Sequence, residues 1–192
     1  MSVMSKKIQS AVLKAIGASA AVVLSAQLAQ AGTFSVSTNS GVKGQFPNAQ
    51  FANAMGCTGE NISPQVSWKN APAGTQSFVV TMYDPDAPTG SGWWHWVVAN
   101  IPADVRELPA GAGSAAGVLP AGVVSFKNDG GQAGYGGICP PAGQTHRYVM
   151  TVHALKVKAL PLPTDATPAL VGFMTYANRI AKASTTLRGA QK

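Results

Sequence analysis

Three apolar runs of strand length, separated by segments rich in glycine and proline, limit the folds open to this chain. The runs are SFVVTMY (Ser77 to Tyr83), WHWVVANI (Trp94 to Ile101) and HRYVMTVHAL (His146 to Leu155). They are rich in β-branched and aromatic residues, which is typical of strands. Both alternating faces of each run are largely apolar, as in the central strands of packed sheets. The runs therefore predict a mainly β fold, a two-layer antiparallel β-sandwich.

Near the C-terminus the apolar residues recur at helical spacing. Thr167 can cap a helix whose first position is Pro168. The apolar residues that follow at helical spacing are Leu170, Phe173, Met174, Ala177, Ile180 and Ala181. We expect one amphipathic C-terminal α-helix packed on the sandwich.

The segment from Ala103 to Tyr135 has a different composition from the strands around it. It contains many glycines and alanines and few large apolar residues. We expect it to be a long excursion over the surface, and long loops in compact domains are often functional.

The first residues of the chain resemble an export signal. Lys6, Lys7 and Lys14 precede AIGASAAVVLSA, an apolar run too short to span a bilayer, and AQA then gives a small-x-small cleavage site ending at Ala31. We expect residues 1–31 to be a signal peptide removed after Ala31, with a transmembrane anchor as the alternative. Residues 32–192 would then form one periplasmic or secreted domain.

Much of the positive charge belongs to this signal. It contains three of the 14 Lys and Arg residues and none of the seven Asp and Glu residues, so its removal lowers the net charge from +7 to +4 (11 − 7). The remaining basic residues are scattered, and we therefore expect no binding of nucleic acid.

Cys57 and Cys139 are the two cysteines of the chain. In an oxidising compartment an even number of cysteines favours a disulfide. Such a bond would close a loop of about 80 residues and, on the chain-entropy model, contribute about 4 kcal/mol. The alternatives are two buried free thiols or a reactive Cys139.

Candidate functional residues are concentrated in the stretch YDPDAPTGSGWWHWV. Asp84 and Asp86 flank a proline there, and His95 lies among three tryptophans, in a chain that has only seven acidic residues and three histidines. The prolines make DPDAP a stiff corner that can hold carboxylates in place. The plainer interpretations are a strand end whose aspartates bond loop amides, and a core histidine.

Strand alternation predicts which of these side chains share a face. Trp93, His95 and Val97 are expected on one side of their strand, and Trp94, Trp96 and Val98 on the other. On the third run His146, Tyr148 and Met150 share a face, opposite Arg147, Val149, Thr151 and His153. We expect His146 and Tyr148 to reach a common pocket without Arg147, and His153 to be structural.

Several ordered blocks of the sequence resemble the phosphatidylethanolamine-binding protein (PEBP) family, and more closely its bacterial, Raf-kinase-inhibitor-like branch. DPDAP with GWWHWVVANIP is similar to the first signature block, and GYGGICPPAGQTHRYVMTVHAL to the second. CTGENISPQVSW resembles the N-terminal block of the branch, and TPALVGFMTYANRIAKAS its terminal helix. The resemblance covers essentially all of the mature chain and implies a PEBP-type β-sandwich with a small anion pocket at one end.

The resemblance also implies which residues bind the ligand. These are Asp84, Pro88, His95, Cys139, Pro140, His146 and Tyr148. A histidine pair can donate hydrogen bonds to phosphate oxygens, an aspartate can fix the tautomer of one ring, and a tyrosine adds a neutral donor. Ile138 stands where many relatives have proline or alanine, which alters the expected rim of the pocket.

We therefore expect a binding module for a phosphate-like small molecule or a phospholipid head group, without a cofactor or a metal. The family resemblance further implies a protein partner and a kinase-inhibitor-like or regulatory role, although export would put cytoplasmic kinases out of reach.

Two other functions remain open. Asp84 or Asp86 with His95 or His146 could serve as an acid and base pair in hydrolysis, although no nucleophile elbow and no HExxH motif is present. The same residues could also hold a metal through two histidines and one carboxylate. The second open function, besides hydrolysis, is that of a protein-interaction module, which would act through the segment from Ala103 to Tyr135.

Overall fold

The computed structural model describes residues 32–191 of the chain, so the predicted signal peptide, residues 1–31, lies outside the described residues. No helix within the described part is long and apolar enough to cross a bilayer. The elements are, in order, β1 (Ser35–Ser37), η1 (Asn48–Gln50), β2 (Val66–Lys69), β3 (Ser77–Asp84), β4 (Trp93–Pro102), β5 (Glu107–Leu108), β6 (Val124–Ser125), β7 (Thr145–Leu155), α1 (Pro168–Asn178) and β8 (Arg179–Ala190).

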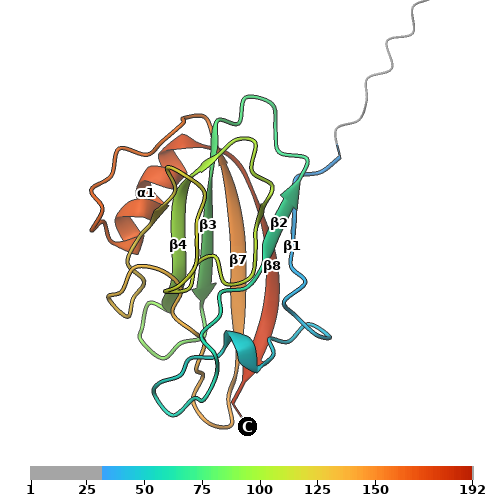
Figure 1. The fold of residues 1–192 in the computed structure, drawn as a ribbon, viewed down its shortest axis with the longest axis vertical. Coiled ribbons are helices and arrows are strands. Elements are labelled where there is room, and N and C mark those ends of the chain that lie inside the picture. The colour runs from blue at the N-terminus through green and yellow to red at the C-terminus, as the bar shows by residue number, and fades with distance from the viewer. Residues whose placement is uncertain (1–31, 192) are drawn as a thin grey trace, which may run out of the picture. The chain divides into compact units, whose positions relative to one another are not determined.

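The named strands form two antiparallel sheets (Figure 1). The smaller sheet has the order β1-β2-β5 and the larger one the order β6-β4-β3-β7-β8. The three runs predicted to be strands are β4, β3 and β7, which are the three inner strands of the larger sheet. This placement confirms the mainly β fold and the central position of the runs.

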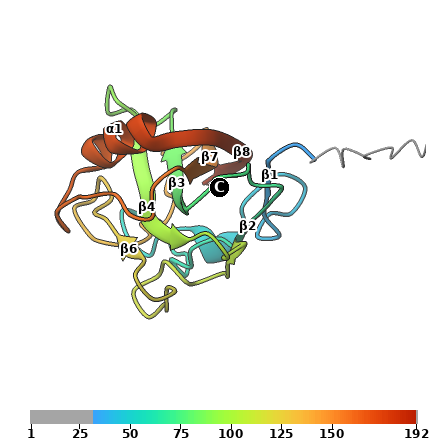
Figure 2. The same ribbon diagram turned by 90° about the horizontal axis from the view of Figure 1, so that it is seen from above.

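Apolar side chains cover both faces of the larger sheet. Between the two sheets lies the main core, which includes Trp68, Phe78, Met82, Trp96, Tyr148 and Met150. A second cluster on the opposite face includes Val79, Val97 and Ala99 and is covered by Val171 of α1. Figure 2 shows α1 and β2 on opposite sides of strands β3, β4 and β7. Burial on both faces explains why these strands have no polar face.

The helix prediction was right at its start and wrong at its end. Thr167 caps α1, and its hydroxyl oxygen accepts a hydrogen bond from the backbone N–H of Leu170 at 3.2 Å. The helix ends at Asn178, so Ile180 and Ala181 belong to β8 instead. Since the edge of β7 offers unpaired backbone groups, residues 179–190 gain a full ladder of hydrogen bonds as a strand.

The buried face of α1 was predicted correctly only at Met174, which packs against the second cluster. Val171 and Thr175 are its buried residues, whereas Phe173 is 68% exposed and Leu170 40% exposed. The sequence PALVGFMTYAN has apolar residues around most of the helix, so its periodicity does not select one side.

The segment from Ala103 to Tyr135 is only in part a surface excursion. It contributes β5 to the smaller sheet and β6 to the larger one. Leu108, Phe126 and Tyr135 from this segment are buried. Three widely spaced large side chains are enough to anchor a segment whose overall composition is typical of a loop.

Candidate functional site

The candidate site lies where β3 ends, β4 begins and β7 begins. Asp84 is the last residue of β3, while His95 and His146 lie near the starts of β4 and β7. All three side chains are buried, with exposed fractions of 3% for Asp84, 5% for His95 and 3% for His146. Because antiparallel neighbours meet at the same end of a sheet, residues from distant parts of the sequence come together here.

The buried side chains of Asp84 and His146 form a hydrogen bond at the centre of the site. Asp84 Oδ2 lies 2.8 Å from Nδ1 of His146. A carboxylate only accepts hydrogen bonds, so Nδ1 carries a proton and the ring orientation is fixed. The other carboxylate oxygen, Oδ1, accepts from the backbone N–H of Asp86 at 2.8 Å. Asp84 thus orients a histidine and closes the turn at the same time.

The second histidine reaches the site through a β-bulge. Tyr83 pairs with Trp94 and Met82 with Trp96, so His95 is the unpaired extra residue on β4. A bulge interrupts the alternation of faces. The ring of His95 packs edge-on against that of Tyr148 at 5.4 Å, and Tyr148 belongs to the same core as Trp96. The prediction that His95 and Trp96 point to opposite sides was therefore wrong. The common face predicted for Trp94 and Trp96 was wrong as well, because Trp94 packs against the second cluster and Trp96 belongs to the main core.

The face assignment predicted for β7 agrees with the structure. His146 and Tyr148 are buried on one side of β7, and Arg147 is exposed on the other. Asp86 pairs with Arg147 instead of joining the pocket, since its Oδ1 lies 2.6 Å from Nη2 of Arg147. The hydrogen-bonded Arg147 lowers the pKa of Asp86 from 3.8 to about 2. Asp86 thus follows the plainer interpretation, a carboxylate that secures the loop.

The two rings of the site have different electrostatic surroundings. Nδ1 of His95 lies 2.8 Å from the carbonyl oxygen of Gly136, to which it donates. Burial lowers the pKa of His95 below its ordinary value of 6.5, against the opposing effects of the Gly136 carbonyl and Asp84. His95 is therefore neutral near pH 7, with Nε2 free to accept a hydrogen bond. Nε2 of His146 lies 3.0 Å from Oε1 of Gln144.

These side chains line a cavity of about 220 Å³. Five of the predicted residues line it: Asp84, Pro88, His95, Cys139 and His146. The prediction missed the other lining residues, which are Met55, Ala87, Thr89, Trp93, Gly137 and Pro141. Most of these six are uncharged and apolar, so the cavity has a small polar centre inside largely apolar walls.

Two predicted residues do not line the cavity. Tyr148 lies beneath it, fully buried, and burial raises the pKa of its hydroxyl above the ordinary value of 10.0. Its ring packs edge-on against the ring of His95. Pro140 is buried beside Pro141, and the latter takes the place in the wall. Tyr148 is thus a packing neighbour of the site in this structure.

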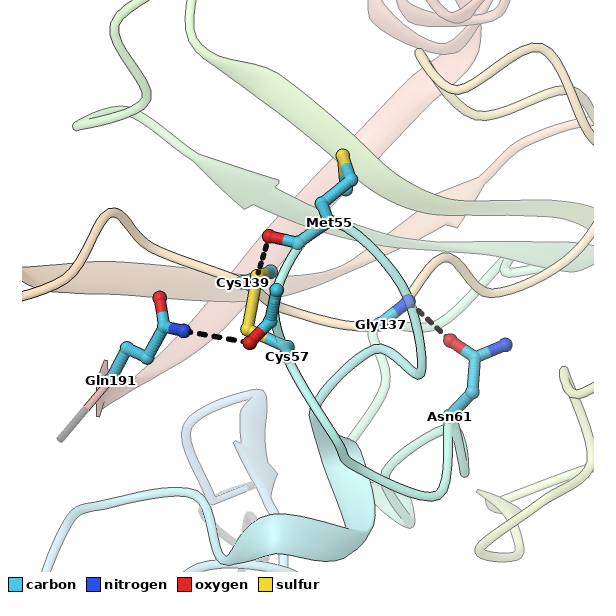
Figure 3. Close-up of a disulfide and its surroundings, with 7 residues drawn as sticks. Met55, Cys57, Asn61, Gly137, Cys139 and Gln191 are labelled. Carbon is cyan, nitrogen blue, oxygen red and sulfur yellow. Dashed lines mark hydrogen bonds between the residues drawn. A yellow bond between two sulfur atoms is a disulfide. The ribbon is translucent and has the colours of Figure 1, made fainter.

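The predicted disulfide is present and forms part of the wall. Cys57 and Cys139 are bonded, with their Cα atoms 5.8 Å apart and a separation of 82 positions in the sequence. Figure 3 shows how the bond holds Met55 against Cys139, where the carbonyl oxygen of Met55 lies 3.4 Å from Sγ of Cys139. The disulfide prediction therefore carried a signal for Met55, since it brings the residues before Cys57 next to Cys139.

The part of the wall at Gly137 is also fixed by specific contacts. The side-chain oxygen of Asn61 accepts from the backbone N–H of Gly137 at 2.6 Å (Figure 3). A Cβ atom at Gly137 would lie 2.4 Å from the backbone nitrogen of Ala52, so only glycine fits there. The wall at Gly137 is set by backbone packing.

A larger cavity of about 590 Å³ lies beyond the disulfide, lined by Cys57 and by Gln45, Phe46, Asn48 and Gln191 among others. None of its lining side chains is ionisable once Cys57 is in the disulfide. We therefore place the candidate site in the smaller cavity, where the titratable groups are. Within residues 32–191 there is no group of three or more His, Cys, Asp or Glu residues arranged to hold a metal ion.

Comparisons with known proteins agree with this architecture. Residues 41–189 match the family model for phosphatidylethanolamine-binding protein. The UPF0098 protein YbhB of Escherichia coli (strain K12) is 52% identical over 142 residues, which is 74% of this chain and 90% of YbhB. A relative from Mycobacterium tuberculosis (strain ATCC 25618 / H37Rv), provisionally named the lipoprotein LppC, is 42% identical over 112 residues, covering 58% of this chain and 51% of LppC.

The fold is also similar to a solved structure. The crystal structure of E. coli YbcL, described as a new member of the mammalian PEBP family, has a TM-score of 0.79 and 48% identity. The match covers 83% of this chain and 99% of that chain. Since a family model matches most of the chain and relatives are about half identical over most of their own length, this chain belongs to the phosphatidylethanolamine-binding protein family.

Proposed function

We propose that the protein binds a small phosphate-like anion, either a free compound or the head group of a lipid, in the cavity between His95 and His146. The observation that carries the proposal is the meeting of two buried imidazole rings and one buried carboxylate at a cavity of about 220 Å³. Burying polar groups costs free energy, and clusters of buried titratable groups at a cavity are typical of functional sites.

Each ring offers a different group to an anion. His95 donates through Nδ1 to Gly136, so Nε2 is the nitrogen left for the ligand. Once protonated, Nε2 can donate to a phosphate oxygen. His146 is oriented by Asp84, and its Nε2 faces the side-chain oxygen of Gln144. An anion oxygen would take the place of this amide oxygen.

The walls suit the organic part of a ligand. Trp93, Pro88, Pro141 and Met55 are uncharged and line the cavity around the two histidines. Apolar walls exclude water and strengthen hydrogen bonds to a charged group inside. The cavity therefore favours a compact anion attached to a small uncharged group.

We also infer that the protein acts in the periplasm or outside the cell. Residues 1–31 have the composition of a signal peptide. A disulfide such as Cys57–Cys139 is typical of oxidising compartments. The provisional lipoprotein name of the mycobacterial relative points in the same direction for that relative. N-terminal sequencing of the protein purified from the cells that produce it would test whether the chain is cleaved after Ala31.

The binding proposal is tested by an NMR titration with inorganic phosphate and with phosphoethanolamine. The imidazole signals of His95 and His146 should shift and saturate, while those of His153, on the opposite face of β7, should not. A variant with both H95Q and H146Q should lose most of the affinity. Unchanged affinity in that variant would refute the proposal. Release of inorganic phosphate from phosphoethanolamine during the titration would instead indicate hydrolysis.

A further inference from the structure

The outer surface of α1 is unusual for a helix that faces solvent. Leu170, Phe173 and Tyr176 are exposed by 40%, 68% and 71%, and their spacing of three residues puts them on one side of the helix. Ile180, the second residue of β8 and four positions after Tyr176 in the sequence, is 41% exposed. We call these four residues the apolar helix surface. α1 itself contains no charged residue.

Basic residues border one end of the apolar helix surface. The guanidinium carbon of Arg179 lies 5.3 Å from the centre of the Tyr176 ring. The backbone N–H of Lys156 donates to the carbonyl oxygen of Asn178, the last residue of α1, at 3.0 Å. Lys182 lies two residues past Ile180 and is exposed. Between residues 156 and 182 the acidic residue is Asp165, at the other end of the helix.

A neighbouring histidine is consistent with a positive potential at this end. His153 pairs with Lys182 across β7 and β8. Its pKa is lowered from 6.5 to about 4, mainly by burial and further by Arg179 and Lys182. Unlike the other exposed large apolar residues, which are Val42, Met55 and Val118, the apolar helix surface combines aromatic and aliphatic side chains with adjacent positive charge.

We propose that the apolar helix surface docks on a membrane that contains anionic phospholipids. Leu, Phe and Tyr side chains partition into the boundary between head groups and acyl chains, and adjacent Arg and Lys residues are attracted to anionic head groups. The charge pattern favours an anionic lipid surface over a second copy of this chain, since a second copy would bring its own basic residues to the contact.

This docking would keep the histidine cavity in water. His146 lies near the start of β7 and Lys156 just after its end, a separation of roughly 30 Å along the strand. The basic end of the apolar helix surface is thus remote from His146. The cavity would then meet soluble ligands near the membrane.

The test is cosedimentation of the protein with vesicles of phosphatidylcholine, with and without phosphatidylglycerol. The wild type and all variants are purified in the form that the producing cells make, with the same N-terminus. Differences in vesicle binding between them therefore result from the substituted surface residues alone. We expect binding to the anionic vesicles, a loss of about tenfold or more in F173S/Y176S, and a weaker, less salt-sensitive interaction in R179Q/K182Q.

The matched control is V118S, which removes another exposed apolar side chain, 83% exposed, away from α1. V118S should bind vesicles like the wild type. Equal binding by wild type and F173S/Y176S would overturn the proposal. A dimer in sedimentation velocity that dissociates in F173S/Y176S, without vesicle binding by the wild type, would also overturn it.

Discussion

The two histidines of the cavity are held by partners of different charge. His146 donates to a carboxylate, Asp84, whereas His95 donates to a neutral backbone carbonyl. Burial lowers the pKa of His95 and keeps its ring neutral. A bound anion would oppose this effect, because its charge favours the protonated ring. His95 should therefore take up a proton when the ligand binds.

This coupling predicts that anion affinity rises as the pH falls. The free protein has a His95 pKa below 6.5, and we expect the complex to have a higher one. Between these two values each unit of pH lowered should strengthen binding by up to about tenfold, with no further gain below the lower value. The measurement is calorimetric titration with sulfate, whose charge is constant over this range, in buffers of different ionisation enthalpy.

The control for this prediction is H95N, in which His146 and Asp84 are retained. Proton uptake on sulfate binding should be lost and the pH dependence reduced. If H95N takes up protons like the wild type, the titrating group is not His95.

At the residue scale the sequence predicted the identity of the polar groups better than their orientation. Asp84, His95 and His146 follow from the signature blocks. The bulge that turns His95 toward Tyr148 does not follow from alternation, because one unpaired residue leaves no mark on composition or spacing. Trp93 and Met55 in the wall result from chain packing around the bulge and the disulfide.

At the scale of elements, the change from α1 to β8 determines how the sheet is completed. β8 pairs with one edge of β7 from Thr145 to Leu155, and β3 pairs with the other edge. The sequence around Asn178 contains no glycine or proline to mark the helix end, so local signals could not locate it. The unpaired edge of β7, a tertiary feature, decides the conformation of residues 179–190.

A pair of glycine substitutions tests this description. A Cβ atom at Gly189 in β8 would lie 2.5 Å from Cδ1 of Ile138 and 2.8 Å from Cε2 of Tyr148, whereas one at Gly172 in α1 meets nothing within 4 Å. We expect G189A to lower the free energy of unfolding by about 1–3 kcal/mol through overpacking. G172A should raise it by about 0.5–1 kcal/mol by reducing the freedom of the unfolded chain.

Urea unfolding of both variants provides the measurement. The two changes add the same methyl group, so opposite signs would follow from their surroundings alone. Equal effects would mean that β8 does not pack against Ile138 and Tyr148 as described.

At the scale of the whole molecule, the disulfide connects two distant parts of the chain at the wall of the cavity. The sandwich class and the disulfide could be predicted, since apolar runs and an even cysteine count reflect general physical constraints. The larger cavity beside Cys57 could not, because it depends on the packing of several irregular segments.

We expect reduction of Cys57–Cys139, or the C57S/C139S variant, to lower the free energy of unfolding by about 4 kcal/mol, because the unfolded chain gains the freedom of an 82-residue loop. Urea titration with and without reductant measures the effect. The serine variant serves as the control and should not respond to reductant. A loss well below this value would show that backbone pairing of Ile138 with Gln50 and Ala52 already holds the two segments together in the unfolded ensemble.

The order of β7 and β8 in the sequence has a consequence for biosynthesis. A ribosome makes the strands that carry Asp84, His95 and His146 long before it makes residues 179–190. Until those last residues emerge, β7 has one edge of unpaired backbone groups from Thr145 to Leu155, which is a template for pairing with other chains. Wrong pairing of this edge is therefore most favoured before residues 179–190 are made, so a chaperone that delays folding, or rapid addition of β8, has its greatest effect in this interval.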